Sequence, residues 1–277
     1  MSKIIVLGGG ESGVGAALLA KSKGFDVFLS DQGTLKEAFK KTLSDHNIRF
    51  KEGQHTLEEI LIEDEVIISP GIPEKNEVVK KIKEQHIPLI SEIEFAVRYT
   101  SAKIIAITGS NGKTTTTLLT YHLLKEAGYQ VGLAGNIGQS FAKQVLENNH
   151  EYYVLEISSF QLDRCISFSP DVAILLNITP DHLDRYEYKF ENYIASKFRI
   201  FQNADLTKTC IFWEDDEVIQ ANKKGIPSSH FSTISSKNNH SDAFISADKI
   251  TLKTGEIDLT TAPFKVHTTQ SICLQLF

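Results

Sequence analysis

A glycine-rich turn between an apolar run and a helix-forming run constrains this chain more than any other feature. The apolar run is Ile104–Ile107, the turn reads Thr-Gly-Ser-Asn-Gly over residues 108–112, and Lys113, Thr114 and Thr115 follow. Such a turn presents backbone N–H groups at a helix N-terminus, where the helix dipole favours an anion. The lysine adds a positive charge for the outer phosphates of a nucleotide, and the threonine hydroxyls can reach a magnesium ion. The sequence therefore predicts a nucleoside triphosphate site made of Gly109, Ser110, Asn111, Gly112, Lys113, Thr114 and Thr115.

Composition and charge narrow the class of protein further. A length of 277 residues suggests about two domains, and a composition of 41% hydrophobic and 23% charged residues is ordinary for a soluble α/β protein. The net charge of −6 argues against non-specific nucleic-acid binding. The three cysteines have no metal-binding spacing, and no apolar run approaches the ~18 residues of a membrane span. We expect a cytoplasmic monomer that binds neither nucleic acid nor membrane.

The first hundred residues open with a β-α-β pattern. A short apolar run at Lys3–Leu7 leads into a Gly-x-Gly-x-x-Gly turn at Gly8–Gly13, and a second run at Phe25–Ser30 ends on Asp31. This arrangement is typical of dinucleotide-binding domains, in which the helix N-terminus holds a pyrophosphate. NAD is the default ligand, but the same turn can hold any nucleoside diphosphate.

Strand and helix patterns alternate along the chain, which predicts an α/β fold with parallel sheets. We expect a Rossmann-like domain at residues 1–100, a P-loop-type nucleotide-binding α/β domain at 101–265, and an aberrant tail at 266–277. Expected strands lie at 65–69, 152–157, 172–176 and 209–213, and expected helices at 76–85, 91–100, 113–127, 190–203 and 215–223. Beyond residue 228 the pattern weakens into short strand-like pieces.

Several polar residues follow predicted strands or lie near them, where open α/β sheets bind ligands. Glu156 closes a predicted strand and could hold a magnesium ion, or it could be a solvated strand end. His182, in an Asp-His-x-Asp sequence, could bind a metal or form a surface hydrogen bond. From its spacing alone, Lys197 reads as a helix-surface lysine, and Asn136 lies in a turn that could face either ligand.

A diphosphate-type turn and a separate triphosphate loop in one chain suggest a nucleotide-carried substrate that ATP activates. With this combination the chain resembles the Mur ligase family of peptidoglycan synthesis. The resemblance rests on five motifs in the family's order: Thr-Gly-Ser-Asn-Gly-Lys-Thr-Thr at 108–115, Gly-Asn-Ile-Gly at 135–138, Glu-Ile-Ser-Ser-Phe-Gln-Leu at 156–162, Asn-Ile-Thr-Pro-Asp-His-Leu-Asp-Arg-Tyr at 177–186, and Ser-Lys at 196–197. Asp163 after the third motif, and Ser-Pro-Gly-Ile-Pro at 69–73, point to the branch that adds D-glutamate to UDP-N-acetylmuramoyl-L-alanine.

The resemblance implies a mechanism. ATP phosphorylates the terminal carboxylate of UDP-N-acetylmuramoyl-L-alanine, and the amine of D-glutamate attacks the resulting acyl phosphate. In this picture Lys113 holds the outer phosphates of ATP, Thr114 and Glu156 hold one Mg²⁺, and His182 and a carbamylated Lys197 hold a second. The remaining implied contacts are Asn136, Ser158 and Gln161 with the muramoyl-alanine end, and Ser12, Asp31 and Gly71 with the UDP end. Beside the uridine diphosphate, Glu11 and Gln32 depart from the pattern that we expect.

The C-terminal part of the sequence departs from the family. The resemblance leads us to expect Lys-Gly-x-His-Asn-x-x-Asn and then a third, Rossmann-like domain, but the chain continues from Lys265 with Val-His-Thr-Thr-Gln. A single-base deletion after the Lys265 codon would account for the tail at 266–277, and the gene sequence tests this. We accordingly expect the 277-residue chain to bind the UDP-substrate but to show little or no ligase turnover.

Three other interpretations remain open at this stage. A sibling ligase, either another Mur ligase or a folylpolyglutamate synthase, shares the ATP loop, and a folate enzyme should ignore UDP-sugars. A non-catalytic nucleotide-binding remnant is the alternative outside enzymes. An NAD-dependent oxidoreductase would explain Gly8–Gly13 and Asp31 but would leave the Lys113 loop without a purpose.

Overall fold

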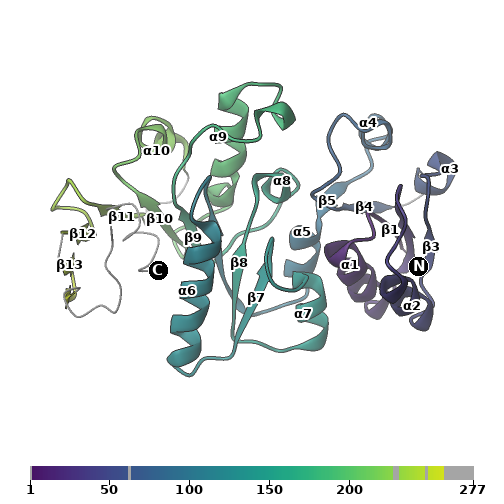
Figure 1. Ribbon diagram of the computed structural model, residues 1–277, viewed down its shortest axis with the longest axis horizontal. Coiled ribbons are helices and arrows are strands. Elements are labelled where there is room, and N and C mark those ends of the chain that lie inside the picture. Colours follow the sequence, from purple (N-terminus) through teal and green to yellow (C-terminus); the bar gives the residue numbers. More distant parts are fainter. Residues whose placement is uncertain (1, 62–63, 227–230, 247–248, 259–277) are drawn as a thin grey trace. The chain divides into compact units, whose positions relative to one another are not determined.

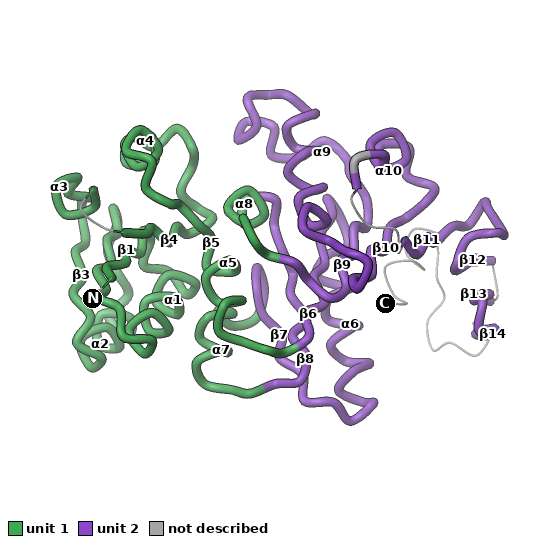
Figure 2. The backbone as a smooth tube through the Cα atoms, turned by 180° about the vertical axis from the view of Figure 1, so that it is seen from behind, with its two compact units in different colours: residues 1–102, 138–149, 160–168 green, residues 103–137, 150–159, 169–277 purple. Residues whose placement is uncertain are grey.

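The computed structural model describes residues 2–61, 64–226, 231–246 and 249–258. These residues form two compact units, which Figure 2 colours separately. Unit 1 contains residues 1–102, 138–149 and 160–168, and unit 2 contains 103–137, 150–159 and 169–277. The tail at 266–277 lies outside the described residues.

Unit 1 is built on a five-stranded parallel sheet in the order β3-β2-β1-β4-β5. Figure 1 labels four of these strands, β1, β3, β4 and β5. The central strand of the sheet is entirely apolar after the first residue, as expected for a strand that is covered on both faces. The strands are β1 Lys3–Leu7, β2 Asp26–Ser30, β3 Arg49–Lys51, β4 Glu65–Ile68 and β5 Leu89–Ser91. The helices of the first hundred residues are α1 Glu11–Ser22, α2 Glu37–Asp45, α3 Leu57–Ile60, α4 Glu77–Glu84 and α5 Glu92–Val97.

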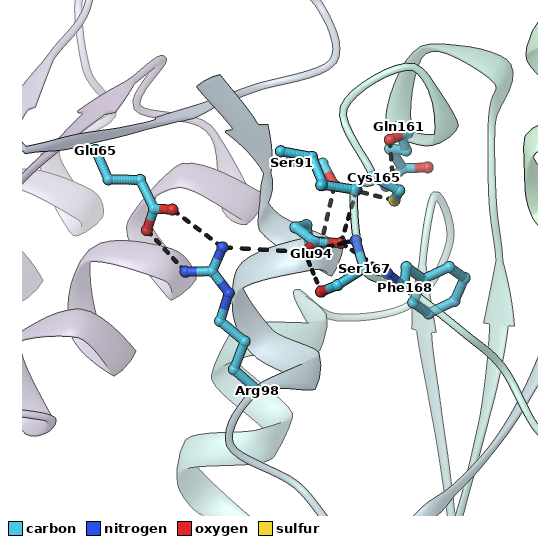
Figure 3. A network of polar contacts seen from close by, with 9 residues as sticks. Glu65, Ser91, Glu94, Arg98, Gln161, Cys165, Ser167 and Phe168 are labelled. Atoms are coloured by element: carbon cyan, nitrogen blue, oxygen red, sulfur yellow. Dashed lines mark hydrogen bonds and ion pairs between the residues drawn. The ribbon is translucent and has the colours of Figure 1, made fainter. Parts of the chain in front are cut away.

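Two short segments from later in the chain complete unit 1. They contain α7 (Phe141–Glu147) and most of α8 (Ser159–Leu162). Glu94 of α5 is 1% exposed and accepts hydrogen bonds from the backbone N–H groups of Ile166, Ser167 and Phe168. Figure 3 shows Glu94 with Ser167 and Phe168. The carboxylate of this buried glutamate thus anchors the segment 160–168 to α5. The contact joins residues that are far apart in the sequence, so no local sequence pattern predicts it.

Glu92, on the same helix, anchors the other segment. The residue is 3% exposed, and its Oε1 accepts hydrogen bonds from Ser140 Oγ at 2.5 Å and Ala142 N at 2.8 Å. Its Oε2 is buried without a hydrogen-bond partner in the described structure. Burial raises the pKa of Glu92 to about 7, against the hydrogen bonds from Ser140 and Ala142, which lower it.

This raised pKa predicts a pH-dependent stability. The folded protein binds more protons than the unfolded chain between the ordinary value of 4.5 and about 7, so stability is lost as the pH rises through that window. We expect about 3 kcal/mol to be lost across it, and Glu92→Gln to remove this part of the pH dependence. Urea unfolding followed by circular dichroism at several pH values measures the effect. If Glu92→Gln and the exposed control Glu77→Gln have the same pH dependence, the prediction is wrong.

Unit 2 contains a nine-stranded sheet in the order β14-β13-β12-β11-β10-β9-β6-β8-β7. It is parallel from β7 to β12 and antiparallel from β12 to β14. The strands are β6 Lys103–Thr108, β7 Val131–Gly135, β8 Tyr152–Glu156, β9 Val172–Leu175, β10 Thr209–Trp213, β11 Phe231–Ser235, β12 Ala243–Ile245, β13 Lys249–Leu252 and β14 Gly255–Asp258. The helical elements are α6 Lys113–Glu126, η1 Leu183–Arg185, α9 Phe190–Phe198, η2 Arg199–Phe201, α10 Glu217–Asn222 and η3 Lys223–Gly225.

The sheet order explains why the site forms where it does. Strand β6, which precedes the glycine-rich turn, is paired with β8 on one side and β9 on the other. The carboxyl ends of these neighbouring parallel strands meet at one edge of the sheet. Glu156, at the end of β8, and the loop that follows β9 therefore lie beside the glycine-rich turn.

Candidate functional site

The glycine-rich turn has the backbone geometry that its sequence predicts. Gly109 and Gly112 have φ values of 155° and 81°, which favour glycine, and Gly112 is the N-cap of α6. Lys113 begins the helix, and its Nζ donates to the carbonyl oxygens of Gly109 and Ser110 at 2.9 and 3.0 Å. Burial lowers the pKa of Lys113, while the negative charges of Glu156 and Asp181 raise it. Its amine thus lies over the turn, within the electrostatic reach of both carboxylates.

The loop after β9 braces this turn. Asn177 accepts hydrogen bonds from Ser110 N through its backbone oxygen and from Asn111 N through its side chain, both at 2.9 Å. Ser110 Oγ donates to the carbonyl oxygen of Thr179 and accepts from its N–H, each at 2.9 Å. The turn is therefore held by a second loop and not by its own residues alone. The sequence analysis did not identify Asn177 and Thr179 as residues that brace the turn. Their position directly after a predicted strand, at the edge of the sheet where the turn lies, could have indicated this role.

Glu156 lies at the centre of a polar cluster. The residue is 2% exposed, Thr114 Oγ1 donates to Oε2 at 2.7 Å, and Asn136 Nδ2 donates to Oε1 at 2.8 Å. Gly135, which precedes Asn136, allows the backbone to lie this close to Glu156. A Cβ at position 135 would lie 2.2 Å from the backbone oxygen of Glu156. No ion pair among the described residues involves Glu156, so its negative charge is held by neutral donors.

Lys197 also reaches the glycine-rich turn. It lies on α9, is 2% exposed, and donates from Nζ to Gly109 O at 2.9 Å and to Thr108 Oγ1 at 3.2 Å. The helix-surface position that its spacing alone suggests is therefore wrong, and the resemblance corrected it. The lysine amine also lies 5.3 Å from the ring centroid of Tyr193, one turn earlier on the helix.

Tyr193 is a site residue that the sequence reasoning missed. It is 1% exposed, and its hydroxyl lies 3.1 Å from Ser110 Oγ. Because the serine donates its only proton to Thr179 O, the tyrosine must be the donor in this pair. The signal was available, since Tyr193 is four residues before Lys197 and thus on the same face of the helix.

Two substitutions at Tyr193 separate its two contacts. Tyr193→Phe keeps the ring beside Lys197 but loses the hydrogen bond to Ser110, and should cost about 1 kcal/mol of unfolding free energy. Tyr193→Leu loses both contacts and leaves a cavity, and should cost about 3 kcal/mol. Urea unfolding followed by fluorescence of Trp213, which lies in the same unit, measures both. If both variants lose the same unfolding free energy, the contact between the Tyr193 ring and Lys197 contributes nothing to stability.

His182 lies at the surface of the same unit. Its side chain is 55% exposed and its Nε2 is 3.5 Å from Asp181 Oδ2. Its backbone is left-handed, with φ of 49°. Such a backbone is uncommon for a non-glycine residue and often marks a functional loop. No group of three or more His, Cys, Asp or Glu side chains in the described residues forms a metal-binding arrangement.

The first glycine-rich turn forms a second candidate site, in unit 1. Asp31 accepts hydrogen bonds from Gly9 N at 2.5 Å and Gly33 N at 2.7 Å, so its carboxylate is fixed at the end of β2. Ser12 is half-buried in the first turn of α1, and Gly71 is exposed in the turn after β4. These three residues follow adjacent strands, and the chain reverses its strand order between β1 and β4, where such sheets bind ligands.

The structure explains why the last residue of this motif is a glycine. A Cβ at Gly13 would lie 1.8 Å from the backbone oxygen of Gly8, so α1 can pack against the turn only if this residue is glycine. The sequence reasoning did not include His55, which lies beside Asp31: its Nδ1 is 2.8 Å from Ser30 Oγ. Burial lowers the pKa of His55, against the charge of Asp31.

The three residues expected at the muramoyl-alanine end differ in their surroundings. Asn136 is exposed and holds Glu156, and Ser158 is half-buried. Both belong to unit 2, whereas Gln161 belongs to unit 1 and is 2% exposed. The geometry within unit 2 thus brings together Asn136 with Lys113, Thr114, Glu156 and Lys197.

The site of unit 2 defines a class of protein. A strand flanked by parallel neighbours ends in a glycine-rich turn, a lysine opens the following helix, and a carboxylate closes the adjacent strand. These features belong to P-loop-type α/β proteins. The chain belongs to the Mur ligase family: the model of the Mur ligase middle domain matches residues 107–276, and the model of the MurD N-terminal domain matches residues 3–78.

Curated relatives support the family assignment. The UDP-N-acetylmuramoylalanine–D-glutamate ligase of Bacteroides fragilis is 58% identical over 228 residues, which make up 82% of this chain and 51% of that protein. The protein of the same name from Cytophaga hutchinsonii is 58% identical over 227 residues, or 81% of this chain and 50% of that protein. The chain therefore spans about half the length of the curated relatives it matches.

A solved structure has a similar fold. The UDP-N-acetylmuramate:L-alanyl-γ-D-glutamyl-meso-diaminopimelate ligase of Neisseria meningitidis matches with a TM-score of 0.62 and 18% identity, covering 99% of this chain and 90% of that chain. This likeness confirms the α/β architecture predicted from the sequence. In the part of the chain that the structure describes, no helix is long and apolar enough to cross a membrane.

Proposed function

We propose that the chain is part of an ATP-dependent ligase that joins D-glutamate to UDP-N-acetylmuramoyl-L-alanine. The observation that carries this proposal is the 58% identity to enzymes named for that reaction, together with the two family-model matches. The site geometry supports it. Unit 2 has a turn suited to a triphosphate, and unit 1 has a turn suited to the diphosphate of a UDP-linked substrate.

The proposed reaction has two steps. The γ-phosphoryl group of ATP passes to the terminal carboxylate of the substrate, which gives an acyl phosphate and ADP. The amine of D-glutamate then attacks the carbonyl carbon, the bond to the phosphate oxygen breaks, and an amide and inorganic phosphate result. Such phosphoryl transfer depends on alignment and charge neutralisation more than on covalent help from the protein.

The residues of unit 2 fit these requirements. The backbone N–H groups at the start of α6 and the amine of Lys113 would hold the outer phosphates of ATP. Asn136 orients the Glu156 carboxylate and, as an exposed side chain, is available to the substrate carboxylate. Ser158 and Gln161 complete the proposed contacts with the muramoyl-alanine end, and Ser12, Asp31 and Gly71 those with the UDP end.

The donor atoms also fit a magnesium ion. Glu156 offers a buried carboxylate that has no ion-pair partner within the described part of the chain, and it lies beside the Thr114 hydroxyl. One carboxylate, one hydroxyl and phosphate oxygens are a usual Mg²⁺ environment, and the ion would neutralise phosphate charge. We propose His182 and Lys197 for a second ion. Lys197 donates as an amine, so it could hold a cation only after its Nζ has reacted with CO₂ to give a carbamate, with release of a proton.

Isothermal titration calorimetry of the chain with a panel of ligands tests the proposal. UDP-N-acetylmuramoyl-L-alanine should bind at least about tenfold more tightly than UDP-N-acetylmuramate or UDP-N-acetylglucosamine, a difference of about 1.4 kcal/mol. A preference for UDP-N-acetylmuramate would indicate a sibling Mur ligase, and a preference for a folate would indicate a folylpolyglutamate synthase. Binding of NAD in place of the UDP compounds would contradict the proposal.

A further inference from the structure

Asp216 connects two elements of unit 2. It is the N-cap of α10, and its Oδ1 accepts a hydrogen bond from Ile219 N at 2.9 Å. Its Oδ2 accepts a second hydrogen bond, from Ile178 N at 3.0 Å, although the two residues are 38 positions apart in the sequence. A serine or asparagine would be sufficient for the cap alone, so the second contact indicates an additional role.

Ile178 lies between the two residues that brace the glycine-rich turn. Asn177 accepts hydrogen bonds from Ser110 N and Asn111 N, and Thr179 exchanges two hydrogen bonds with Ser110 Oγ. Ile178 itself is 2% exposed, so its backbone N–H has no access to water. Without Asp216 this buried donor would lose its partner, and the loop would have to move to satisfy it.

We propose that Asp216 is a positioning residue for the triphosphate site. Its carboxylate fixes residues 177–179, and these fix the glycine-rich turn with its N–H groups directed at the phosphates. The cost of ordering the turn is thereby met before the nucleotide binds. This inference rests on the proposed function, because it assigns the turn to ATP.

Asp216→Ser separates the two contacts of the carboxylate. A serine hydroxyl at the N-cap still accepts the hydrogen bond from Ile219 N, but its side chain is too short to keep both bonds. The affinity for MgATP should fall about tenfold, which corresponds to about 1.4 kcal/mol. The affinity for UDP-N-acetylmuramoyl-L-alanine, whose UDP end we assign to unit 1, should stay unchanged.

Hydrogen–deuterium exchange without nucleotide provides a readout that does not depend on the ligand. Amides of residues 108–113 and 177–179 should exchange faster in the Asp216→Ser variant, whereas those of α10 should not. Asp205→Ser is the matched control, because Asp205 also accepts two hydrogen bonds in unit 2, both from Thr207. If Asp216→Ser unfolds, Asp216→Asn, which keeps one acceptor oxygen at full length, takes its place in both measurements.

The outcomes separate the inference from the proposed function. Unchanged exchange of both segments and unchanged MgATP affinity in a folded Asp216 variant would overturn the positioning role. If the unsubstituted chain does not bind MgATP, the nucleotide assignment fails, and the exchange measurement still decides whether Asp216 orders the turn. Faster exchange throughout unit 2 would show a general structural role and would likewise overturn the proposal.

Discussion

Glu156→Gln is expected to weaken binding of MgATP by about 100-fold. Loss of a residue that only hydrogen-bonds to a metal ligand already weakens metal binding by about 10- to 100-fold, and Glu156 is proposed as a ligand itself. Glutamine has the same shape and keeps an oxygen that can accept from Asn136 or Thr114, but it lacks the negative charge that a magnesium ion requires. Binding of ADP without magnesium should change by no more than about twofold, because the turn and Lys113 remain. Calorimetric titrations with and without Mg²⁺ measure both values.

The matched control for this prediction is Glu151→Gln. Glu151 lies directly before β8, at the opposite end of that strand from Glu156. It is exposed and accepts a hydrogen bond from Gln130 N. It should leave both affinities unchanged. Equal weakening of magnesium-free ADP binding by Glu156→Gln would show that the side chain only supports the structure of the turn.

Gly135→Ala should lower the unfolding free energy by about 4 kcal/mol. This is the sum of a backbone term, for the positive φ angle, and an overlap term, for the collision of the added Cβ with Glu156. Gly135 has φ of 100°, which an alanine adopts only with strain. An alanine Cβ would also lie 2.2 Å from the backbone oxygen of Glu156, so β7 would have to move away from β8. The displacement would carry Asn136 away from the carboxylate that it holds.

Gly128→Ala isolates the backbone term. Gly128 has φ of 88° and belongs to the same unit, but beyond its two chain neighbours no heavy atom lies within 4 Å of a Cβ placed there. This control should cost about 1–2 kcal/mol. Urea unfolding followed by Trp213 fluorescence measures both variants. Equal costs for the two alanines would show that the close approach of β7 to Glu156 is not a constraint.

The sequence predicted those features that local patterns encode. The glycine-rich turn at 108–112 and the turn at Gly8–Gly13 are short, and each contains a glycine whose positive φ explains that residue type. The helix expected at 113–127 is observed as Lys113–Glu126, and the strand expected at 172–176 as Val172–Leu175. Alternating strands and helices also indicated parallel sheets, since parallel strands need crossover connections.

Features that depend on contacts distant in sequence could not be predicted in this way. The burial of Lys197 depends on how α9 packs over the turn, and its position in the helical pattern gives no sign of it. Residues 138–149 and 160–168 belong to unit 1, where the buried side chains of Glu92 and Glu94 accept hydrogen bonds from them across a long sequence separation. The bond from Ile178 to Asp216 likewise joins residues that belong to different predicted elements.

The central claim is that the chain binds two different nucleotides, each at its own glycine-rich turn. Hydrogen–deuterium exchange with each ligand in turn tests it most directly. UDP-N-acetylmuramoyl-L-alanine should protect residues 8–13 and 31–33, and MgATP should protect 109–115. Each ligand should still protect its own turn when the other is present. Protection of 8–13 by ATP or by NAD, with none by the UDP compound, would contradict the account.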